Sequence, residues 1–275
     1  MSKHRRHMNL TTRGASQRSP RGNQSRLLSR RDWAWEFLRR NPAFRELHAT
    51  TSALSCKIGG NTTAIEISSD QRAALLKWGC IYSDPPDCEA ASARVLWDPA
   101  VCPEVIQMVA FEEDRAIDTP LFELSSIHCQ VTVLATSDSS QYVLFREAAQ
   151  SLQLLVTGAS IERAVHLLST AIVPPQAAKF HFRGLQCFQH LQRTGHIIPD
   201  HCAIEPRSPR YAVVLKALDG YLAGESYRDI ANALFGAQRV HSAWDDPGRH
   251  LHDQVRRAVR RGRDLMEGGY LKLLT

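Results

Sequence analysis

The chain has 275 residues, of which 43% are hydrophobic and 23% charged, the balance of an ordinary folded protein with two or three small domains. No apolar run approaches the roughly 20 residues that a membrane helix requires, and no apolar segment follows the basic N-terminus as in a secretory signal. The seven cysteines are odd in number and form no C-x-x-C pair, which argues against a disulfide framework. We therefore expect a cytoplasmic protein without a membrane partner.

The net charge of +6 is distributed unevenly along the chain. Residues 1–31 contain nine Lys and Arg and no Asp or Glu, and residues 206–275 contain twelve basic and eight acidic residues. The stretch between them has a net charge of −7. Two basic ends around an acidic middle favour a polyanionic partner, and nucleic acid is the commonest one.

Residues 1–27 are rich in Arg, Ser, Gly, Asn and Gln, which predicts a disordered basic arm. Such an arm either makes loose phosphate contacts or only keeps the chain soluble, and the composition favours neither. Residues 28–90 are expected to form an N-terminal unit that begins with a helix capped by Ser29 and Asp32 and ended by Pro42. Three aromatic residues lie in that helix: Trp33, Trp35 and Phe37.

One short helix cannot bury three aromatic side chains alone, so either the core of this unit or a partner molecule must cover them. The core is the favoured alternative. The sequence then predicts a short strand at 65–67, a helix over 70–78 and a linker over 84–87.

Residues 91–205 have the composition of a central α+β domain. Short runs rich in β-forming residues are separated by polar turns, which predicts a small antiparallel sheet. These runs are 121–124, 129–135, 142–145 and 152–156. A helix is expected over 161–171 with Ser160 as its cap, and another from Pro174 to Arg193, ended by Gly195.

Residues 206–275 are expected to be helical. The pattern predicts a helix over 209–219, a turn between Gly220 and Gly224, and a short helix that Ser226 and Asp229 cap and Gly236 ends. Tyr227 and Arg228 open this short helix and are candidates for phosphate contacts.

The last helix, expected over 249–267, has two unlike faces. Its apolar residues recur at the spacing of a buried stripe: Leu251, Val255, Ala258, Val259, Gly262, Leu265 and Met266. The candidate DNA-binding residues lie off that stripe or at the start of the helix: Arg249, Arg256, Arg257, Arg260, Arg261 and Arg263. Arg binds phosphates and guanine edges through paired hydrogen bonds, so this face favours DNA over a merely solvated surface.

The order of the last three helices is that of a helix-turn-helix DNA reader. One departure is the segment 237–248 before the Arg-rich helix, because the motif normally has three or four residues there. Asp246 and Pro247 are expected to start the helix. Trp244 is the candidate to hold this segment against the core.

Several motifs of the C-terminal half resemble a known bacterial DNA-binding domain. They are Ala217-Leu-Asp-Gly220, Leu222-Ala-Gly224, Ser226-Tyr-Arg-Asp-Ile-Ala231, Ala233-Leu-Phe-Gly236 and the Arg-rich run from Arg256 to Tyr270. The resemblance is to the RovC-type transcription factor of type VI secretion and covers about 95–275. Residues 31–45 resemble a regulator-like domain that often precedes it. The resemblance implies a transcriptional regulator, often an oligomeric activator, although related members act as antiactivators through protein contacts.

No enzyme signature is present in the sequence: there is no Gly-rich phosphate loop, no H-E-x-x-H and no serine elbow. Cys187, His190, His196, His201 and Cys202 are of metal-binding types but lack paired finger spacing, so no metal or cofactor is expected. A buried structural role is favoured for Cys187. Asp264 and Glu267 are interpreted as members of helix-surface ion pairs.

The sequence therefore predicts a non-enzymatic α+β transcriptional regulator, with activation as the favoured role. Its expected partners are double-stranded DNA, a second copy of the chain, and RNA polymerase or another regulator. A homo-oligomer is expected because one helix-turn-helix rarely binds DNA tightly alone, and because aromatic residues near Trp33 could be exposed. The alternative is an antiactivator or co-regulator that binds protein, and RNA is a weaker candidate because no aromatic residue interrupts the Arg cluster.

Overall fold

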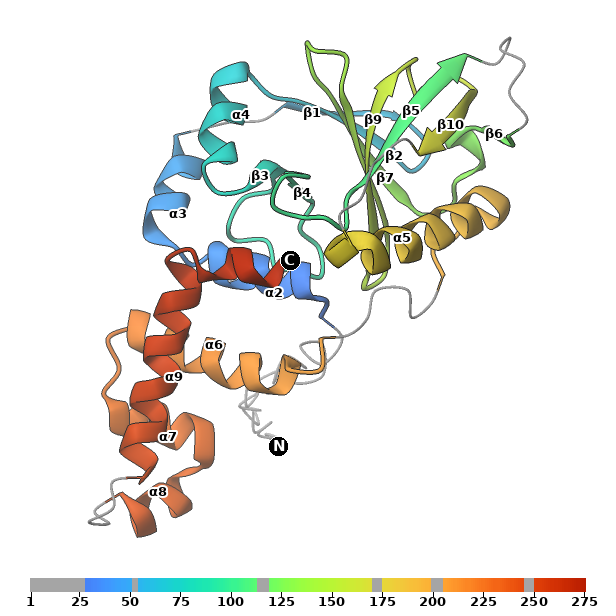
Figure 1. Ribbon diagram of the computed structural model, residues 1–275. Helices are drawn as coiled ribbons and strands as arrows, with labels where there is room; N and C mark the ends of the chain where they lie inside the picture. The colour runs from blue at the N-terminus through green and yellow to red at the C-terminus, as the bar shows by residue number, and fades with distance from the viewer. Residues whose placement is uncertain (1–27, 51–53, 113–118, 170–174, 199–204, 245–249) are drawn as a thin grey trace, which may run out of the picture.

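The computed structural model describes residues 28–50, 54–112, 119–169, 175–198, 205–244 and 250–275. Figure 1 shows a large sheet with a long helix against one face, and beside it a group of helices built mainly from the C-terminal residues. The fold class is α+β with helical regions at both ends, as the sequence predicts. No described helix is long and apolar enough to cross a membrane.

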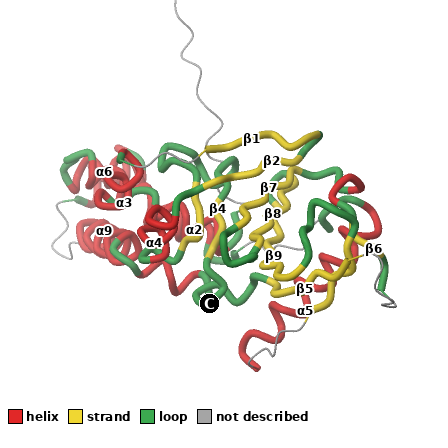
Figure 2. Tube along the Cα trace, turned by 90° about the horizontal axis from the view of Figure 1, so that it is seen from above, coloured by secondary structure: helices red, strands yellow, loops and turns green. Residues whose placement is uncertain are grey.

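The sheet has eight strands and is larger than the sequence indicates. In spatial order they are β1 (Leu54–Gly59), β2 (Thr62–Glu66), β7 (Gln130–Ala135), β8 (Gln141–Glu147), β9 (Gln150–Gly158), β5 (Ile106–Glu112), β10 (Val165–Ser169) and β6 (Leu121–Phe122). Figure 2 shows most of them in succession. Most neighbours are antiparallel, but β2 pairs with β7 and β5 pairs with β9 in parallel. The sheet thus joins strands from both sides of residue 90, where the sequence places a domain boundary.

Both faces of the sheet are covered. Val143 and Phe145 of β8 belong to a core that includes Phe188 and Leu191 of α5 (Pro175–Thr194). Tyr142 and Leu144 alternate with them and pack on the opposite face. That second face is covered by a two-stranded sheet of β3 (Cys80–Ser83) and β4 (Val95–Trp97). Cys187 of α5 is fully buried, which agrees with a structural role.

The prediction of a helix over 161–171 is wrong. Residues Val165–Ser169 form β10, which pairs with β5 on one side and β6 on the other. Val165 and Leu167 are buried in the sheet core, with the alternation of a strand. The expected helix from residue 174 is present as α5, and Gly195 ends it with φ +75°.

The segment 84–87 is a connection, as expected, but it is anchored in the core and not a free linker. The buried carboxylate of Asp84 accepts hydrogen bonds from the Arg94 backbone N–H at 2.8 Å, the Arg94 guanidinium at 2.7 Å and the Tyr82 hydroxyl at 2.8 Å. Burial alone would raise the pKa of Asp84, but these hydrogen bonds lower it. The ion pair between Asp84 and Arg94 therefore links the end of β3 to the start of β4.

The first described helix, α2 (Arg30–Leu38), begins at Ser29 through the predicted capping box with Asp32. Asn41 then caps α3 (Pro42–Ala49), so Pro42 opens a second helix instead of only ending the first. The next helix, α4 (Ser69–Leu76), is also the predicted one, and Ser68 caps it.

The three aromatic residues of α2 are buried inside the molecule. Trp33 donates its indole N–H to Ser208 at 2.8 Å and lies 5.6 Å from the Tyr211 ring. Trp35 donates to the Cys88 carbonyl at 3.0 Å, and Phe37 is fully buried. The core therefore covers this helix, and the expectation of exposed aromatics near Trp33 is wrong.

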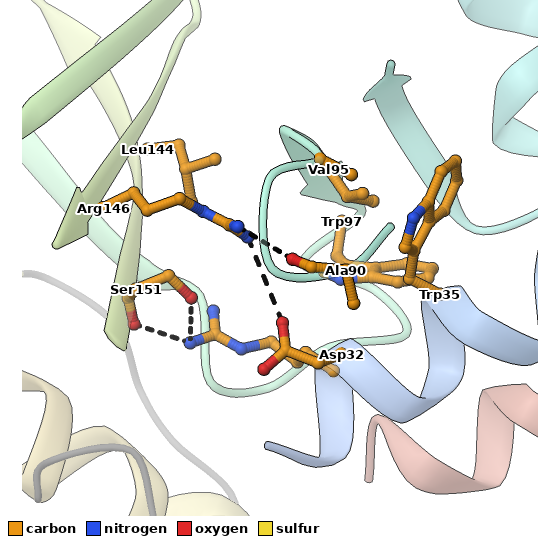
Figure 3. Close-up of a pocket in the computed structure, with 10 residues that line it drawn as sticks. Asp32, Trp35, Ala90, Val95, Trp97, Leu144, Arg146 and Ser151 are labelled. Atoms are coloured by element: carbon orange, nitrogen blue, oxygen red, sulfur yellow. Dashed lines mark hydrogen bonds and ion pairs between the residues drawn. The ribbon is translucent and has the colours of Figure 1, made fainter. Parts of the chain in front are cut away.

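A buried charged network joins α2 to the sheet (Figure 3). Arg31 donates to the Ser151 carbonyl at 2.8 Å, and Arg146 of β8 donates to the Ala90 carbonyl at 2.8 Å. Arg146 also lies 4.0 Å from Asp32, and a cavity of about 10 Å³ separates these groups. Burial raises the pKa of the Asp32 carboxyl although Ser29 and Arg146 act against it. The network fixes α2 relative to the sheet.

Candidate nucleic-acid interface

The C-terminal residues form four helices around a small apolar core. They are α6 (Ser208–Leu222), α7 (Tyr227–Phe235), α8 (Ala237–Ala243) and α9 (His250–Met266). Ile230 of α7, Val240 of α8 and Val255 of α9 share one buried cluster with Ala217 of α6. A one-turn helix of the 3₁₀ type, η3 (Gly269–Leu273), follows α9 and packs on α2.

The start of α7 agrees with the sequence. Ser226 caps it by accepting a hydrogen bond from the Asp229 backbone N–H, and Gly224 turns the chain with φ +78°. Gly220, in contrast, lies inside α6 and does not bracket the turn. Its position is buried, and a Cβ there would lie 2.9 Å from Ile230 Cγ1, so α6 and α7 approach closely.

The segment after α7 contains a helix that the sequence analysis missed. Gly236, with φ +89°, makes a one-residue turn between α7 and α8, a backbone conformation that L side chains rarely adopt. The prediction of a long irregular connection is therefore wrong for 237–243. Trp244 packs on the C-terminal core and lies edge-on to His252 at 5.8 Å, as its expected role requires. Asp246 and Pro247 lie outside the described residues.

Helix α9 packs its predicted apolar stripe against α6. Leu251, Val255, Val259 and Leu265 are buried. Gly262 lies at the closest approach, because a Cβ there would be 2.8 Å from Leu218 Cβ and 3.2 Å from the Val214 carbonyl oxygen. The opposite face of the helix is therefore left for solvent or a partner.

All five arginines predicted on α9 within the described range are exposed: Arg256, Arg257, Arg260, Arg261 and Arg263. Two of them are paired with carboxylates, one within α9 and one directly after its end. Arg256 lies 3.2 Å from Asp253, and Arg263 lies 3.4 Å from Glu267, the helix-surface pair expected for that residue. The Arg263 guanidinium also lies 5.5 Å from the centre of the Tyr221 ring.

The remaining three arginines have no carboxylate within ion-pair distance among the described residues. Arg257 donates to the Asp253 carbonyl at 3.2 Å and otherwise faces solvent. Arg260 and Arg261 have no acidic partner in the described part of the chain. Within the described residues, the structure therefore leaves three guanidinium groups without an ion pair, fewer than the candidate arginines that the sequence predicts on this helix.

Two of the other candidate DNA-binding residues lie at the start of α7, and a third lies outside the described residues. Tyr227 is half-buried, with its ring edge-on to His252 at 5.5 Å, so α7 and α9 meet at this point. Arg228 is the next residue of α7 and is exposed. Arg249 lies outside the described residues. Every assigned DNA contact among these residues stays a prediction.

The sequence analysis missed three further exposed arginines of this helical group. Arg207 and Arg210 lie at the start of α6 and line a surface hollow together with Arg261 of α9. Arg239 is exposed on α8, with its guanidinium 5.6 Å from the centre of the Phe235 ring. The net charge of 206–275 indicated such residues, but their placement beside α9 depends on helix packing that local patterns do not reveal.

Two family comparisons cover much of the chain. Residues 172–275 match the family described as T6SS, Transcription factor, DNA binding domain, with the name RovC_DNA-bd. Residues 16–82 match the Proteobacterial transcriptional regulator-like domain. No curated protein matches the chain. The C-terminal match begins before α5, so it takes in α5 as well as the four-helix group.

Both matched families consist of transcriptional-regulator domains, not enzyme domains. The RovC-type match includes all of α9 with its exposed arginines. The regulator-like match includes α2, whose aromatic residues pack on the four-helix group. The chain is thus similar to a RovC-type transcription-factor DNA-binding domain over its C-terminal residues and to a proteobacterial transcriptional regulator-like domain before them.

Proposed function

We propose that this transcriptional regulator binds duplex DNA through the outward face of α9, with Arg257, Arg260 and Arg261 as its principal contacts. The observation that carries the proposal is a single helix with one face packed on α6 and α7 and free guanidinium groups on the other. Arg groups with no carboxylate partner can bind phosphate without first breaking an ion pair.

Duplex DNA suits this arrangement better than other polyanions. The 17 residues of α9 span about 25 Å, and a helix fits the major groove of B-form DNA. In this proposal Tyr227 and Arg228 of α7 contact phosphates beside the groove, while the α9 arginines divide between phosphates and base edges. Arg256 and Arg263 contribute less, since each is held by a carboxylate.

The test is a triple variant in which Arg257, Arg260 and Arg261 are changed to Gln. Loss of three phosphate or base contacts should weaken duplex binding by several orders of magnitude at low salt and flatten its salt dependence. A matched control changes Arg163, Lys179 and Arg193 to Gln, because these exposed residues belong to none of the helices α6 to α9 and their replacement removes the same charge. Electrophoretic mobility shift or fluorescence anisotropy over a salt series measures both.

Equal DNA affinity of the triple variant and the control, with both folded by circular dichroism, would rule out α9 as the binding face. Absence of salt-dependent duplex binding by the unaltered protein would favour the second candidate function, an antiactivator or co-regulator that binds protein. Asp253, Asp264 and Glu267 favour that alternative, because they place negative charge on the exposed side of the same helix. A stable complex with another regulator or with RNA polymerase would then be expected.

Self-association is part of the proposal. A second copy would supply a second half-site, as in most helix-turn-helix regulators. The burial of Trp33 removes one reason for expecting it, so the expectation depends on the family resemblance and on the DNA-binding mode. Sedimentation at micromolar concentration should give a mass above the 30.8 kDa of one chain, and a clean monomer both with and without DNA would contradict it. The role as an activator is likewise a proposal, which a reporter fusion tests.

A further inference from the structure

A second basic feature lies on the side of the four-helix group where the start of α6 meets α9. Arg207, Arg210 and Arg261 line a surface hollow of about 240 Å³, with Tyr211 and Val214 as its other lining residues. Arg207 and Arg210 lie more than fifty residues before Arg261 in the sequence, and the packing of α6 on α9 brings them together.

No carboxylate neutralises these three guanidinium groups among the described residues. The nearest acidic residue in sequence, Glu205, is buried; it accepts a hydrogen bond from the Arg207 backbone N–H at 3.0 Å and lies 3.6 Å from Arg30. Its carboxylate is thus shared between the Arg207 backbone and Arg30, and it forms no ion pair with the guanidinium groups of Arg207, Arg210 or Arg261. Three like charges around one concave surface repel each other, and a bound anion would relieve that repulsion.

Arg207, the N-cap residue of the 15-residue α6, makes no side-chain cap hydrogen bond, so its guanidinium is not used to close the helix start. The first N–H groups of α6 are satisfied by Glu205 and are not available to a ligand in the hollow. The hollow therefore combines three planar donors with the side chains of Tyr211 and Val214, and no acidic residue in the described part of the chain lines it.

We propose that this hollow is a phosphate-binding pocket in which Arg207, Arg210 and Arg261 together bind one phosphate group. Guanidinium groups bind phosphate oxygens through charge-assisted, often paired hydrogen bonds. The phosphate comes either from the DNA backbone or from a small phosphorylated molecule. The first source rests on the proposed function and makes Arg261 a phosphate contact, not a base-reading residue.

The first measurement concerns free phosphate and does not depend on DNA. Inorganic phosphate is titrated against the full chain at constant ionic strength, with chloride as the reference, and its effect on the thermal unfolding midpoint is recorded. A variant with Arg207→Gln and Arg210→Gln should bind phosphate about tenfold more weakly or worse, as expected when charge-assisted hydrogen bonds are lost. Arg261→Gln should have the same effect, and adding it to the double variant should change little more.

A matched control carries Arg163→Gln and Arg193→Gln, two exposed arginines outside the hollow. It should keep the full response to phosphate. The proposal of a phosphate-binding pocket is contradicted if phosphate stabilises the unaltered protein, the double variant and the control equally, or if it stabilises none of them. Arg261→Gln alters α9 and leaves the start of α6 intact. Weaker phosphate binding in both this variant and the double variant would therefore not be explained by a folding defect at the start of α6.

The second measurement identifies the source of the phosphate. If the pocket holds a DNA phosphate, the double variant should bind all duplex sequences more weakly and its log–log salt slope should fall by about 1. Unchanged DNA binding together with lost phosphate stabilisation would assign the pocket to a small phosphorylated molecule. If the unaltered protein binds no DNA, the proposed function fails while the phosphate titration still decides the pocket.

Discussion

At the scale of single residues, Glu36 connects α2 to two other segments from inside the protein. Its carboxylate accepts hydrogen bonds from Arg39 at 2.8 Å, from Arg40 at 2.7 Å and from the Ala90 backbone N–H at 2.8 Å. Arg40 also forms an ion pair with Asp219 of α6. Burial alone would raise the pKa of Glu36, but the two arginines and the backbone hydrogen bond lower it.

Replacing Glu36 by Gln should destabilise the protein by about 2–3 kcal/mol at neutral pH, because hydrogen bonds to a charged group are lost inside the core. A carboxyl whose pKa is lower in the folded state stabilises the fold above its unfolded pKa, with an ordinary value of 4.5, and loses that effect as the pH falls. The difference in unfolding free energy between the two proteins should therefore narrow below pH 4.5. Urea denaturation at several pH values measures it, and a difference that stays constant down to pH 3 would contradict the ionic role.

At the scale of elements, the contact of α6 with α9 depends on Gly262. Gly to Ala at an exposed helix position stabilises a helix by up to about 1 kcal/mol. At residue 262 the new methyl group would lie 2.8 Å from Leu218 Cβ, so α6 and α9 would have to separate.

We expect Gly262→Ala to destabilise the protein by about 1–3 kcal/mol, the usual cost of overpacking, and to weaken DNA binding by displacing α9. Chemical denaturation gives the stability change. Its sign is decisive: an increase in stability would mean that the two helices are not in close contact at this point.

The elements that could be predicted from sequence are those with local signals. Ser29 and Ser226 cap their helices as expected, because a cap requires only residues within one turn. Helix α8 was missed because Val240 is its one buried apolar residue among those whose burial is described, and because a glycine stands where a polar cap would be expected. Strand β10 was misread because its two neighbours in the sheet, β5 and β6, come from distant parts of the chain.

The candidate site likewise could be predicted from sequence only where its signals are local. The exposure of the α9 arginines follows from helical periodicity, which sequence alone reveals. Their division into paired and free groups depends on side-chain geometry, as at Arg256 and Asp253. The hollow lined by Arg207 and Arg261 arises only when α6 packs on α9, and no local pattern encodes it.

At the scale of the whole molecule, the four-helix group is not a separate module. Tyr211 of α6 and Met266 of α9 share their core with Trp33 and Phe37 of α2. The Asn41 side chain also donates to the Met266 carbonyl at 3.1 Å. The first described helix, α2, is thus folded against the C-terminal helices α6 and α9, as Figure 1 shows.

A fragment of residues 205–275 should therefore fail to unfold cooperatively, because it leaves the apolar surface that α2 covers exposed to water. Differential scanning calorimetry of the fragment and the full chain tests this. Addition of a peptide with residues 28–50 should restore part of the transition, whereas a scrambled peptide should not. A cooperative transition of the fragment alone, near that of the full chain, would show that α2 is dispensable.

The burial of Trp33 by the last helices also determines when the protein can finish folding during its synthesis. Trp33 is synthesised well before its partners Ser208 and Tyr211 and before the neighbouring η3. At about 5–20 residues per second, that delay lasts on the order of ten seconds or more. During that interval the aromatic side chains of α2 are not yet buried by α6 and η3. A nascent chain truncated before α6 therefore exposes these side chains to chaperones and proteases.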